Sequence, residues 1–358
     1  MENVIPKVGM QSYRGYLRRK VWILLLLVFS LFLVILMSLS TGSSVISLGT
    51  ILRGLMGTED IHSTIILWNI RMPRVATAIV VGAALAMAGS VMQCVLRNPL
   101  ASSSTLGVSQ GASFGAAFAI VVLEAGVQIN SASAGAVTVT NPALVTVFAF
   151  LGGMLTTMVI LGISRLSHLP STSMVLTGVA LSSLFTGGTT ILQYFADDVK
   201  IASVVYWTFG DLGRANWREI SIIFALAILA YLYFLGNRWN YNAMETGLQT
   251  AKSLGVHVDR LMLGSMVLCS LITAVSVAFV GVISFIGLIA PHFIRRWIGN
   301  DHRFLIPASA LTGSILLVLA ELVSRTIVSP SILPIGALTS FLGAPMFLFL
   351  LLKGVRTR

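Results

Sequence analysis

Residues 71–115 begin with RMPR (71–74), continue with an apolar run rich in Gly and Ala (75–96), and then read RNPLA (97–101) and LGVSQGA (106–112). The apolar run matches the roughly 20 residues that a helix needs to cross a bilayer. In the following apolar segment, Gly107, Gly111 and Gly115 recur at every fourth position, which lets a neighbouring helix approach closely. The stretch therefore predicts two membrane-spanning helices that are joined by a polar loop and packed against other helices.

The composition of the chain extends this prediction to a multi-pass membrane protein. Hydrophobic residues make up 56% of the 358 residues and charged residues only 10%, whereas a soluble domain has roughly 25% charged residues. We predict an all-α integral membrane protein with about ten transmembrane helices, forming a single transmembrane domain over residues 1–358. The predicted spans are 21–39, 75–96, 106–123, 143–163, 173–195, 218–235, 261–280, 282–298, 306–326 and 335–352.

The distribution of basic residues predicts the orientation. With a cytoplasmic N-terminus and ten spans, seven of the 23 Lys and Arg residues fall outside, and the other 16 fall inside. The seven are Arg53, Arg71, Arg74, Lys200, Arg214, Arg218 and Arg325. Because cytoplasmic segments carry an excess of Lys and Arg, both termini are predicted to be cytoplasmic, as are residues 1–20 and the loop 236–260. The net charge of +11 is thereby explained without a nucleic-acid partner.

Three loops carry further expectations. Apolar residues at roughly helical spacing in 40–70 suggest a short helix on the outer surface. The segment 196–217, with two tryptophans and several charges, is predicted to be an outer loop. In the cytoplasmic loop 236–260, residues 241–256 are predicted to form a short amphipathic helix that stops at Gly255. The residues leave open whether this helix rests on the membrane or docks a cytoplasmic partner.

The sequence lacks the motifs of several enzyme classes. It has no phosphate-binding Gly-x-x-x-x-Gly-Lys-Ser/Thr loop, so nucleotide hydrolysis by this chain is not expected. No His-Glu-x-x-His or Cys-x-x-Cys motif is present, and the five histidines are scattered, so neither a metal site nor a cofactor is expected. Cys94 and Cys269 are predicted to be packing residues within spans. The chain is therefore predicted not to be an enzyme.

Charged residues at span ends allow more than one interpretation. Glu321 is the main acidic residue within a span, and Arg325 lies four positions later, where the two form a favourable pair on one helix. A paired carboxylate argues against a proton-coupled carrier. Arg71 and Arg74 lie at the outer end of the second span. The residues alone leave open whether these arginines reach lipid headgroups or bind carboxylates of an external protein.

Seven ordered segments resemble one family of membrane permeases. They are RMPR (71–74); NPLA (98–101) with LGVSQG (106–111); STS (171–173); Ala251 with Leu254 and Gly255; GVISFIGLI (281–289) with Pro291 and His292; DHR (301–303); and LPIG (333–336) with LGAP (342–345). Together, they make residues 45–353 similar to the FecCD-type permease subunits of ATP-driven importers for ferric siderophores, haem and cobalamin.

This resemblance implies a ten-span subunit that pairs with a second copy or a close relative. It also implies two cytoplasmic ATPases that use ATP and Mg, an external substrate-binding protein, and no cofactor on this chain. Carried over by motif, Arg71, Arg74 and Arg325 match positions that contact the binding protein. Asn98, Leu100, Thr172 and Ser173 match the inner gate, and Ala251, Leu254 and Gly255 match the segment that couples to the ATPase. The chain departs from the family where Leu248, rather than Glu, follows Gly247.

The resulting functional prediction is a permease of a binding-protein-dependent importer in the cytoplasmic membrane. Its expected substrate is an iron–siderophore-type chelate, with haem, cobalamin and an oxyanion left open. The alternative is an ion-coupled secondary transporter of a small solute, which the Gly-rich spans and Glu321 suggest. An intramembrane enzyme is disfavoured because the spans hold no convergent set of catalytic groups.

Overall fold

A computed structural model describes residues 7–41, 49, 53, 64–125, 128–129, 137–138, 141–167, 171–329 and 331–355. Helices dominate this part of the chain, and a two-residue antiparallel pair, β1 (Gln128–Ile129) with β2 (Val137–Thr138), accompanies them. The helices are α1 (Lys7–Ser40), η1 (Ile66–Arg71), α4 (Met72–Val95), α5 (Val108–Val121), α6 (Pro142–Ser167), α7 (Ser171–Tyr194), α8 (Asp198–Thr208), α9 (Trp217–Gly236), α10 (Arg238–Glu245), α11 (Leu248–Ser253), α12 (Val258–Val280), α13 (Ile286–Ile298), α14 (His302–Thr326) and α15 (Ile335–Val355).

Each of the ten predicted spans coincides with one of these helices, so the predicted all-α membrane fold is confirmed. In the described part, seven helices are long and apolar enough to cross a membrane, and two shorter apolar helices lie at 108–121 and 335–349. The eighth predicted span, 282–298, is mostly α13, whose 13 residues follow a non-helical segment. That segment starts at Gly281 (φ 81°) and ends at Phe285 (φ 65°), and both conformations prevent a helix from beginning earlier. The exact number of spans and the cytoplasmic termini remain predictions.

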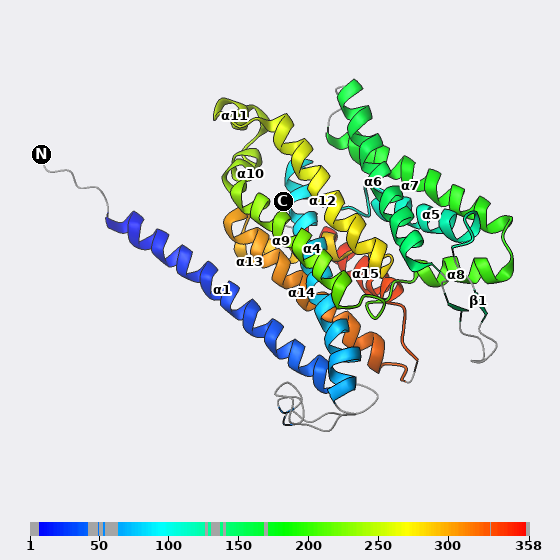
Figure 1. Cartoon of the computed structure of the whole chain (residues 1–358). Helices are drawn as coiled ribbons and strands as arrows, with labels where there is room; N and C mark the ends of the chain where they lie inside the picture. Colours follow the sequence, from blue (N-terminus) through cyan, green and yellow to red (C-terminus); the bar gives the residue numbers. More distant parts are fainter. Residues whose placement is uncertain are drawn as a thin grey trace, which may run out of the picture.

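The helix α4 forms the centre of the fold. It packs against α9, α12, α13 and α14, while α5, α6, α7 and α8 form a group to one side (Figure 1). Two glycine pairs bring the central helices into backbone contact, Gly82 against Gly313 and Gly89 against Gly287. A Cβ atom on any of these four glycines would overlap the backbone of the opposite helix. Such contacts between small residues hold membrane helices together where lipid supplies no hydrophobic driving force.

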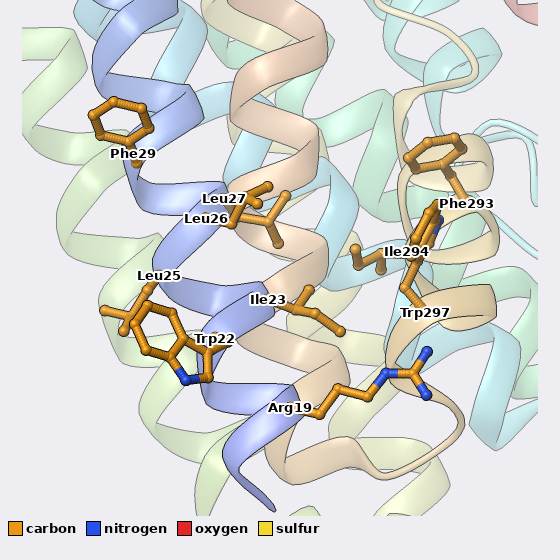
Figure 2. A pocket seen from close by; sticks show the side chains of 10 residues that line it. All are labelled: Arg19, Trp22, Ile23, Leu25, Leu26, Leu27, Phe29, Phe293, Ile294 and Trp297. Atoms are coloured by element: carbon orange, nitrogen blue, oxygen red, sulfur yellow. The ribbon is translucent and has the colours of Figure 1, made fainter. Parts of the chain in front are cut away.

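The first helix lies along the outside of the bundle. The side chains of α1 are mostly exposed, and α1 packs chiefly against α14 (Figure 1). Between α1 and α13 runs a groove with an almost wholly apolar lining, which includes Trp22, Phe29 and Trp297, and Arg19 lies at one end (Figure 2). An apolar surface of this kind suits the hydrocarbon of a bilayer. The outer face of α1 therefore has the apolar character that contact with lipid requires.

Two loop predictions need correction. The segment 196–217 contains the helix α8, which Asp197 caps by accepting a hydrogen bond from the Lys200 backbone N–H (2.9 Å). The single amphipathic helix predicted over 241–256 is instead the end of α10 followed by α11, because Gly247 (φ 130°) interrupts the backbone. The predicted stop at Gly255 (φ 84°) is confirmed. The apolar positions of the outer helix expected in 40–70 lie outside the described residues.

Contacts among α1, α4, α10 and α14 define one end of the bundle, called here the coupling-loop end. Cys94 near the end of α4 donates a hydrogen bond to the Tyr241 carbonyl of α10 (3.5 Å). Asn242 of α10 donates to Asp301, which caps α14 (3.0 Å). Lys20 of α1 lies 3.7 Å from the same carboxylate. The first basic segment of the chain and the loop 236–260 therefore lie at the same end, as the charge distribution predicts.

Candidate functional site

The predicted inner gate begins directly after α4, in the loop 96–107. Arg97 takes a left-handed conformation (φ 48°), and the Asn98 side chain accepts a hydrogen bond from the Leu100 backbone N–H (2.9 Å). This local turn leaves the Leu100 side chain 37% exposed. Hydroxyl groups of Ser102 and Thr105 close the loop through further short-range hydrogen bonds. The loop is thus a compact, hydrogen-bonded turn that presents Leu100 at the surface.

The second part of the predicted gate lies at the start of α7. The carbonyl of Ser173 accepts a hydrogen bond from the Thr177 hydroxyl (2.9 Å), while the side chain of Thr172 lies outside the described part. Further along, α5 and α7 border a hollow, and most of the residues that line it carry a hydroxyl or amide group. The lining residues are Ser104, Thr105, Gln110, Val179, Ser182, Ser183 and Thr186. Sequence analysis did not single out this hollow, although the density of hydroxyl residues in 171–190 was a usable signal.

The predicted coupling segment is firmly anchored through α10. Tyr241 is fully buried, and its hydroxyl lies 2.8 Å from the Ser265 hydroxyl of α12. Asn242 bridges to α14 in both directions, because it donates to Asp301 and accepts from the His302 backbone N–H (2.8 Å). Burial by itself would raise the pKa of Asp301, but hydrogen bonds from Arg303 and Asn242 outweigh it and hold that pKa well below its usual range. Three core helices therefore fix the position of α10.

The three predicted coupling residues differ in exposure. The side chain of Ala251 in α11 is fully buried, whereas the side chain of Leu254 is 67% exposed. Gly255 is exposed and has a left-handed backbone conformation. Within the described part of the chain no atom lies within 4 Å of an added Cβ, so the backbone conformation favours glycine here and steric crowding does not. The three residues therefore lie in one short segment, in which Ala251 packs against the protein and Leu254 presents an apolar side chain at the surface.

The three predicted docking arginines lie at the opposite end of the bundle, called here the Arg71 end. Arg71 and Arg325 are largely buried there, and Arg74 is more exposed. Arg71 is only 3% exposed and donates to the Leu39 carbonyl at the end of α1 (2.6 Å). Arg325 pairs with Glu321 (Nε–Oε1 3.2 Å) and donates to the Ser38 carbonyl (2.8 Å). The predicted Glu321–Arg325 pair is confirmed, and these groups tie α1 to α14.

Arg74 lies closer to the surface. Its side chain is 18% exposed, and Nη2 is 3.9 Å from Asp211 Oδ1. The guanidinium lies against Gly213, where an added Cβ would be 2.5 Å from Nη2. In the same loop the exposed Arg214 donates a hydrogen bond to the Tyr206 carbonyl (2.8 Å). Among the three predicted docking arginines, Arg74 is the one placed at a surface that contains other charged side chains.

These features define a class of protein: a multi-pass, helical membrane protein whose central helix, α4, runs from the Arg71 end of the bundle to the loop 96–107 and the anchored helix α10. Residues 28–353 match the FecCD transport family. The chain belongs to that family.

Relatives of known name agree with this assignment. The chain is 50% identical to a Methanocaldococcus jannaschii protein named as an ABC transporter permease, MJ0087, over 96% of this chain and 97% of that one. It is 35% identical to the hemin transport system permease protein HmuU of Yersinia pestis, over 90% and 94% of the two chains. It is 33% identical to the vitamin B12 import system permease protein BtuC of Vibrio vulnificus, over 80% and 83%.

The fold agrees as well. A structure described as an inward-facing conformation of a metal-chelate type ABC transporter superposes with a TM-score of 0.79 at 30% identity, over 92% of this chain and 99% of that one. The chain is thus an ABC importer permease of the FecCD and BtuC type, and its family is a transport permease rather than an enzyme.

Proposed function

We propose that the chain is the permease subunit of a binding-protein-dependent importer in the cytoplasmic membrane, which moves an iron–siderophore-type chelate into the cell. Haem and cobalamin are the nearest alternatives, because relatives are named for them. ATP and Mg are used by two partner ATPases, and the permease itself binds no nucleotide. An external binding protein delivers the chelate and supplies most of the affinity for it.

The coupling segment is the observation that supports this proposal most directly. An exposed leucine at the end of a short helix presents an apolar side chain that a groove on a partner protein is able to bury. Here that leucine, Leu254, belongs to a segment that buried contacts of Tyr241 and Ala251 hold in place. A force applied to Leu254 is therefore passed to α4, α12 and α14, which α10 contacts or adjoins. An ATPase seated at Leu254 is thus able to bias the packing of the central helices.

The exposed surface of α7 supports a second permease copy as partner. Leu176 and Leu184 are 68% and 66% exposed, while the hollow lined by Gln110 and Ser182 lies on the same helix. The Gln110 side-chain oxygen has no hydrogen-bond partner within the described structure, and an unpaired amide oxygen is poorly suited to contact with lipid. A second copy that packs beside α7 would enclose the hollow as a water-filled pathway. We expect a homodimer, and a heterodimer with a related chain is the other outcome.

The ion-coupled alternative is less well supported. It would use Glu321 as the membrane carboxylate that takes up a proton or cation. In the structure the Glu321 carboxylate is engaged by Arg325 and accepts a hydrogen bond from the Ser38 hydroxyl (3.1 Å). Because Arg325 and the Ser38 hydroxyl already bind this carboxylate, Glu321 is poorly suited to take up and release a transported proton or cation.

Transport in proteoliposomes tests the proposal. The permease is reconstituted with its ATPase, and a binding protein loaded with ferric siderophore, haem or cobalamin is added outside. We expect uptake of one of these chelates that requires ATP inside the reconstituted system and persists when an uncoupler abolishes the ion gradients. Uptake that survives removal of ATP and collapses with the uncoupler would instead establish the ion-coupled carrier.

Charge reversal at Arg74 should weaken docking of the binding protein. Arg74→Glu replaces a surface cation with an anion beside Asp211, so we expect roughly tenfold lower affinity at low salt and a smaller loss at high salt. Binding of the purified external protein to permease in nanodiscs measures this affinity across a salt series. Lys252→Glu, an equally drastic reversal on exposed α11 at the coupling-loop end, is the control and should leave this affinity unchanged. Equal affinities for Arg74→Glu and the unaltered permease would remove Arg74 from the docking surface.

A further inference from the structure

Three side chains with metal-binding atoms converge at the coupling-loop end, although they are far apart in sequence. They are Cys94 at the end of α4, Glu245 at the end of α10 and His302 at the start of α14. The cysteine sulfur, a carboxylate oxygen and an imidazole nitrogen all lie within 4.8 Å of one another. His302 Nε2 and Glu245 Oε1 are already 3.5 Å apart. This cluster is referred to below as the Cys94 cluster.

His302 is the least readily explained member of the cluster. Its side chain is 0% exposed, and neither ring nitrogen has a hydrogen-bond partner in the described part of the chain. A buried imidazole normally has both nitrogens satisfied, because an unpaired buried polar group costs on the order of 1–3 kcal/mol. The His302 Nε2 and Glu245 Oε1 atoms lie 3.5 Å apart without forming a hydrogen bond. The ring lies 5.6 Å from that of Tyr241, which helps fix its orientation toward the cluster.

The distances in the cluster suit a small divalent cation. Zinc binds cysteine sulfur at about 2.3 Å and histidine nitrogen or carboxylate oxygen at about 2.0–2.2 Å, so ligand atoms around a tetrahedral ion are about 3.3–3.8 Å apart. The histidine–carboxylate separation of 3.5 Å already has this value. The thiol needs a shift of no more than about 1.5 Å, which a change of rotamer or a small helix movement provides.

The charge of the site and its access to solvent also suit a divalent cation. A thiolate and a carboxylate together neutralise a divalent cation, and the neutral imidazole adds a third ligand of the kind that Zn²⁺ and Co²⁺ prefer. The Glu245 side chain is 29% exposed, whereas Cys94 and His302 are buried. Glu245 is therefore at the entrance, where solvent supplies the ion and a water molecule as fourth ligand. Asn300 donates a hydrogen bond to the other Glu245 oxygen (3.3 Å). This bond orients the carboxylate and leaves the first oxygen available to bind a metal ion.

We propose that Cys94, Glu245 and His302 form a binding site for one divalent transition-metal ion of the Zn²⁺ or Co²⁺ type. The site lies among α4, α10 and α14, apart from the hollow between α5 and α7. A bound ion cross-links these three helices directly behind the coupling segment. It therefore stabilises one arrangement of α10 relative to the central helix. This inference does not depend on the proposed transport function.

Cobalt titration of the purified full-length chain tests the site. Metal-stripped protein in detergent is titrated with Co²⁺, which gives a near-ultraviolet band when a thiolate coordinates it. We expect one Co²⁺ per chain with this band, and its displacement by Zn²⁺. Cys94→Ser should abolish the band. Cys269→Ser is the matched control, since Cys269 is the other buried free cysteine and lies in α12, so it should keep the band at full strength.

A second variant covers the case in which Cys94→Ser fails to fold. Glu245→Gln removes one ligand at the partly exposed entrance, and we expect at least tenfold weaker Co²⁺ binding, with the thermal transition of the metal-free protein still cooperative. In the unaltered chain, saturating Co²⁺ should raise that transition temperature, since the ion binds only the folded state. Substoichiometric Co²⁺ without a thiolate band, or affinities that neither Cys94→Ser nor Glu245→Gln lowers, would overturn the proposal.

Discussion

Replacing Gly89 with valine is expected to destabilise the folded permease by about 3 kcal/mol, the upper end of the usual cost of overpacking a core. Gly89 of α4 lies against Gly287 of α13, and even a Cβ atom at position 89 would overlap the Gly287 carbonyl group. The opposing atoms are backbone, so no side-chain rotation relieves the overlap. The helices must separate, and the neighbouring contact of α4 with α14 at Gly82 and Gly313 then weakens as well.

Unfolding in detergent, followed by circular dichroism against temperature or denaturant, measures this effect. Gly162→Val in α6 is the matched control, because no other atom of the described residues lies within 4 Å of an added Cβ there. We expect the control to change the free energy of unfolding by no more than about 0.5 kcal/mol. Similar losses in the two variants would mean that the cost comes from valine in a helix and not from the contact of α4 with α13.

The glycine contacts also show which features of helix packing the sequence predicts and which it does not. The spacing of Gly107, Gly111 and Gly115 predicts a helix with a closely packed face, and this is confirmed, since Gly111 faces Gly152 and Gly115 faces the Phe148 backbone. Periodicity along one helix does not identify the partner, however. The contacts of α4 join residues about 200 positions apart, and pairing of that kind depends on the packing of the whole bundle.

The loops were less predictable because single residues control them. Sequence analysis noted Leu248 as a departure from the family pattern, but did not identify the preceding Gly247 as the point that divides α10 from α11. Only a glycine readily adopts its φ of 130°. The helix α8 was missed because its apolar run is short, although Asp197 is a recognisable N-cap residue. In both places, a local backbone effect outweighed hydrophobic periodicity.

The arginine motif shows a similar limit for the site. Arg71 and Arg74 belong to one short motif, and their shared chemistry suggested a shared role. On a helix, positions three apart point in related directions, yet Arg71 contacts the end of α1 and Arg74 contacts the loop around Asp211. Which of them is buried depends on α1, a helix whose packing position is not encoded in the motif. Their roles in docking remain predictions, with Arg74 the better placed.

The Cys94 cluster was beyond sequence reasoning for a different reason. Metal sites are recognised in sequences by short, regular ligand spacing. Cys94, Glu245 and His302 have no such spacing, and the expectation from the sequence was that no metal site exists. Their convergence depends on the anchoring of α10 between α4 and α14, through contacts such as Asn242 with Asp301. The proposed site thus differs from the sequence expectation because tertiary structure supplies the proximity.

Replacing Leu254 with aspartate is expected to weaken association with the ATPase by at least about 30-fold, and to reduce ATP-driven uptake in proportion. An apolar anchor at the centre of an interface commonly contributes 2 kcal/mol or more, and a charge at that position must also be desolvated. The Leu254 side chain is 67% exposed, so the folded permease itself loses little. Co-purification of the ATPase and uptake in proteoliposomes measure the two effects, and a normal thermal transition confirms that the variant is folded.

Ile327→Asp is the control that shows whether the loss of ATPase binding in Leu254→Asp is specific to the coupling-loop end. Ile327 is 65% exposed, nearly as much as Leu254, but it follows α14 at the Arg71 end of the bundle. If the ATPase binds at the coupling-loop end, Ile327→Asp keeps the ATPase while Leu254→Asp loses it. If both variants lose it equally, the effect is a general consequence of charge on an apolar surface. If neither does, the coupling segment carries no ATPase contact, and the proposed importer mechanism fails at its cytoplasmic step. The pair of variants therefore tests the orientation of the chain and its energy source together, because only a cytoplasmic coupling-loop end is able to meet an ATPase.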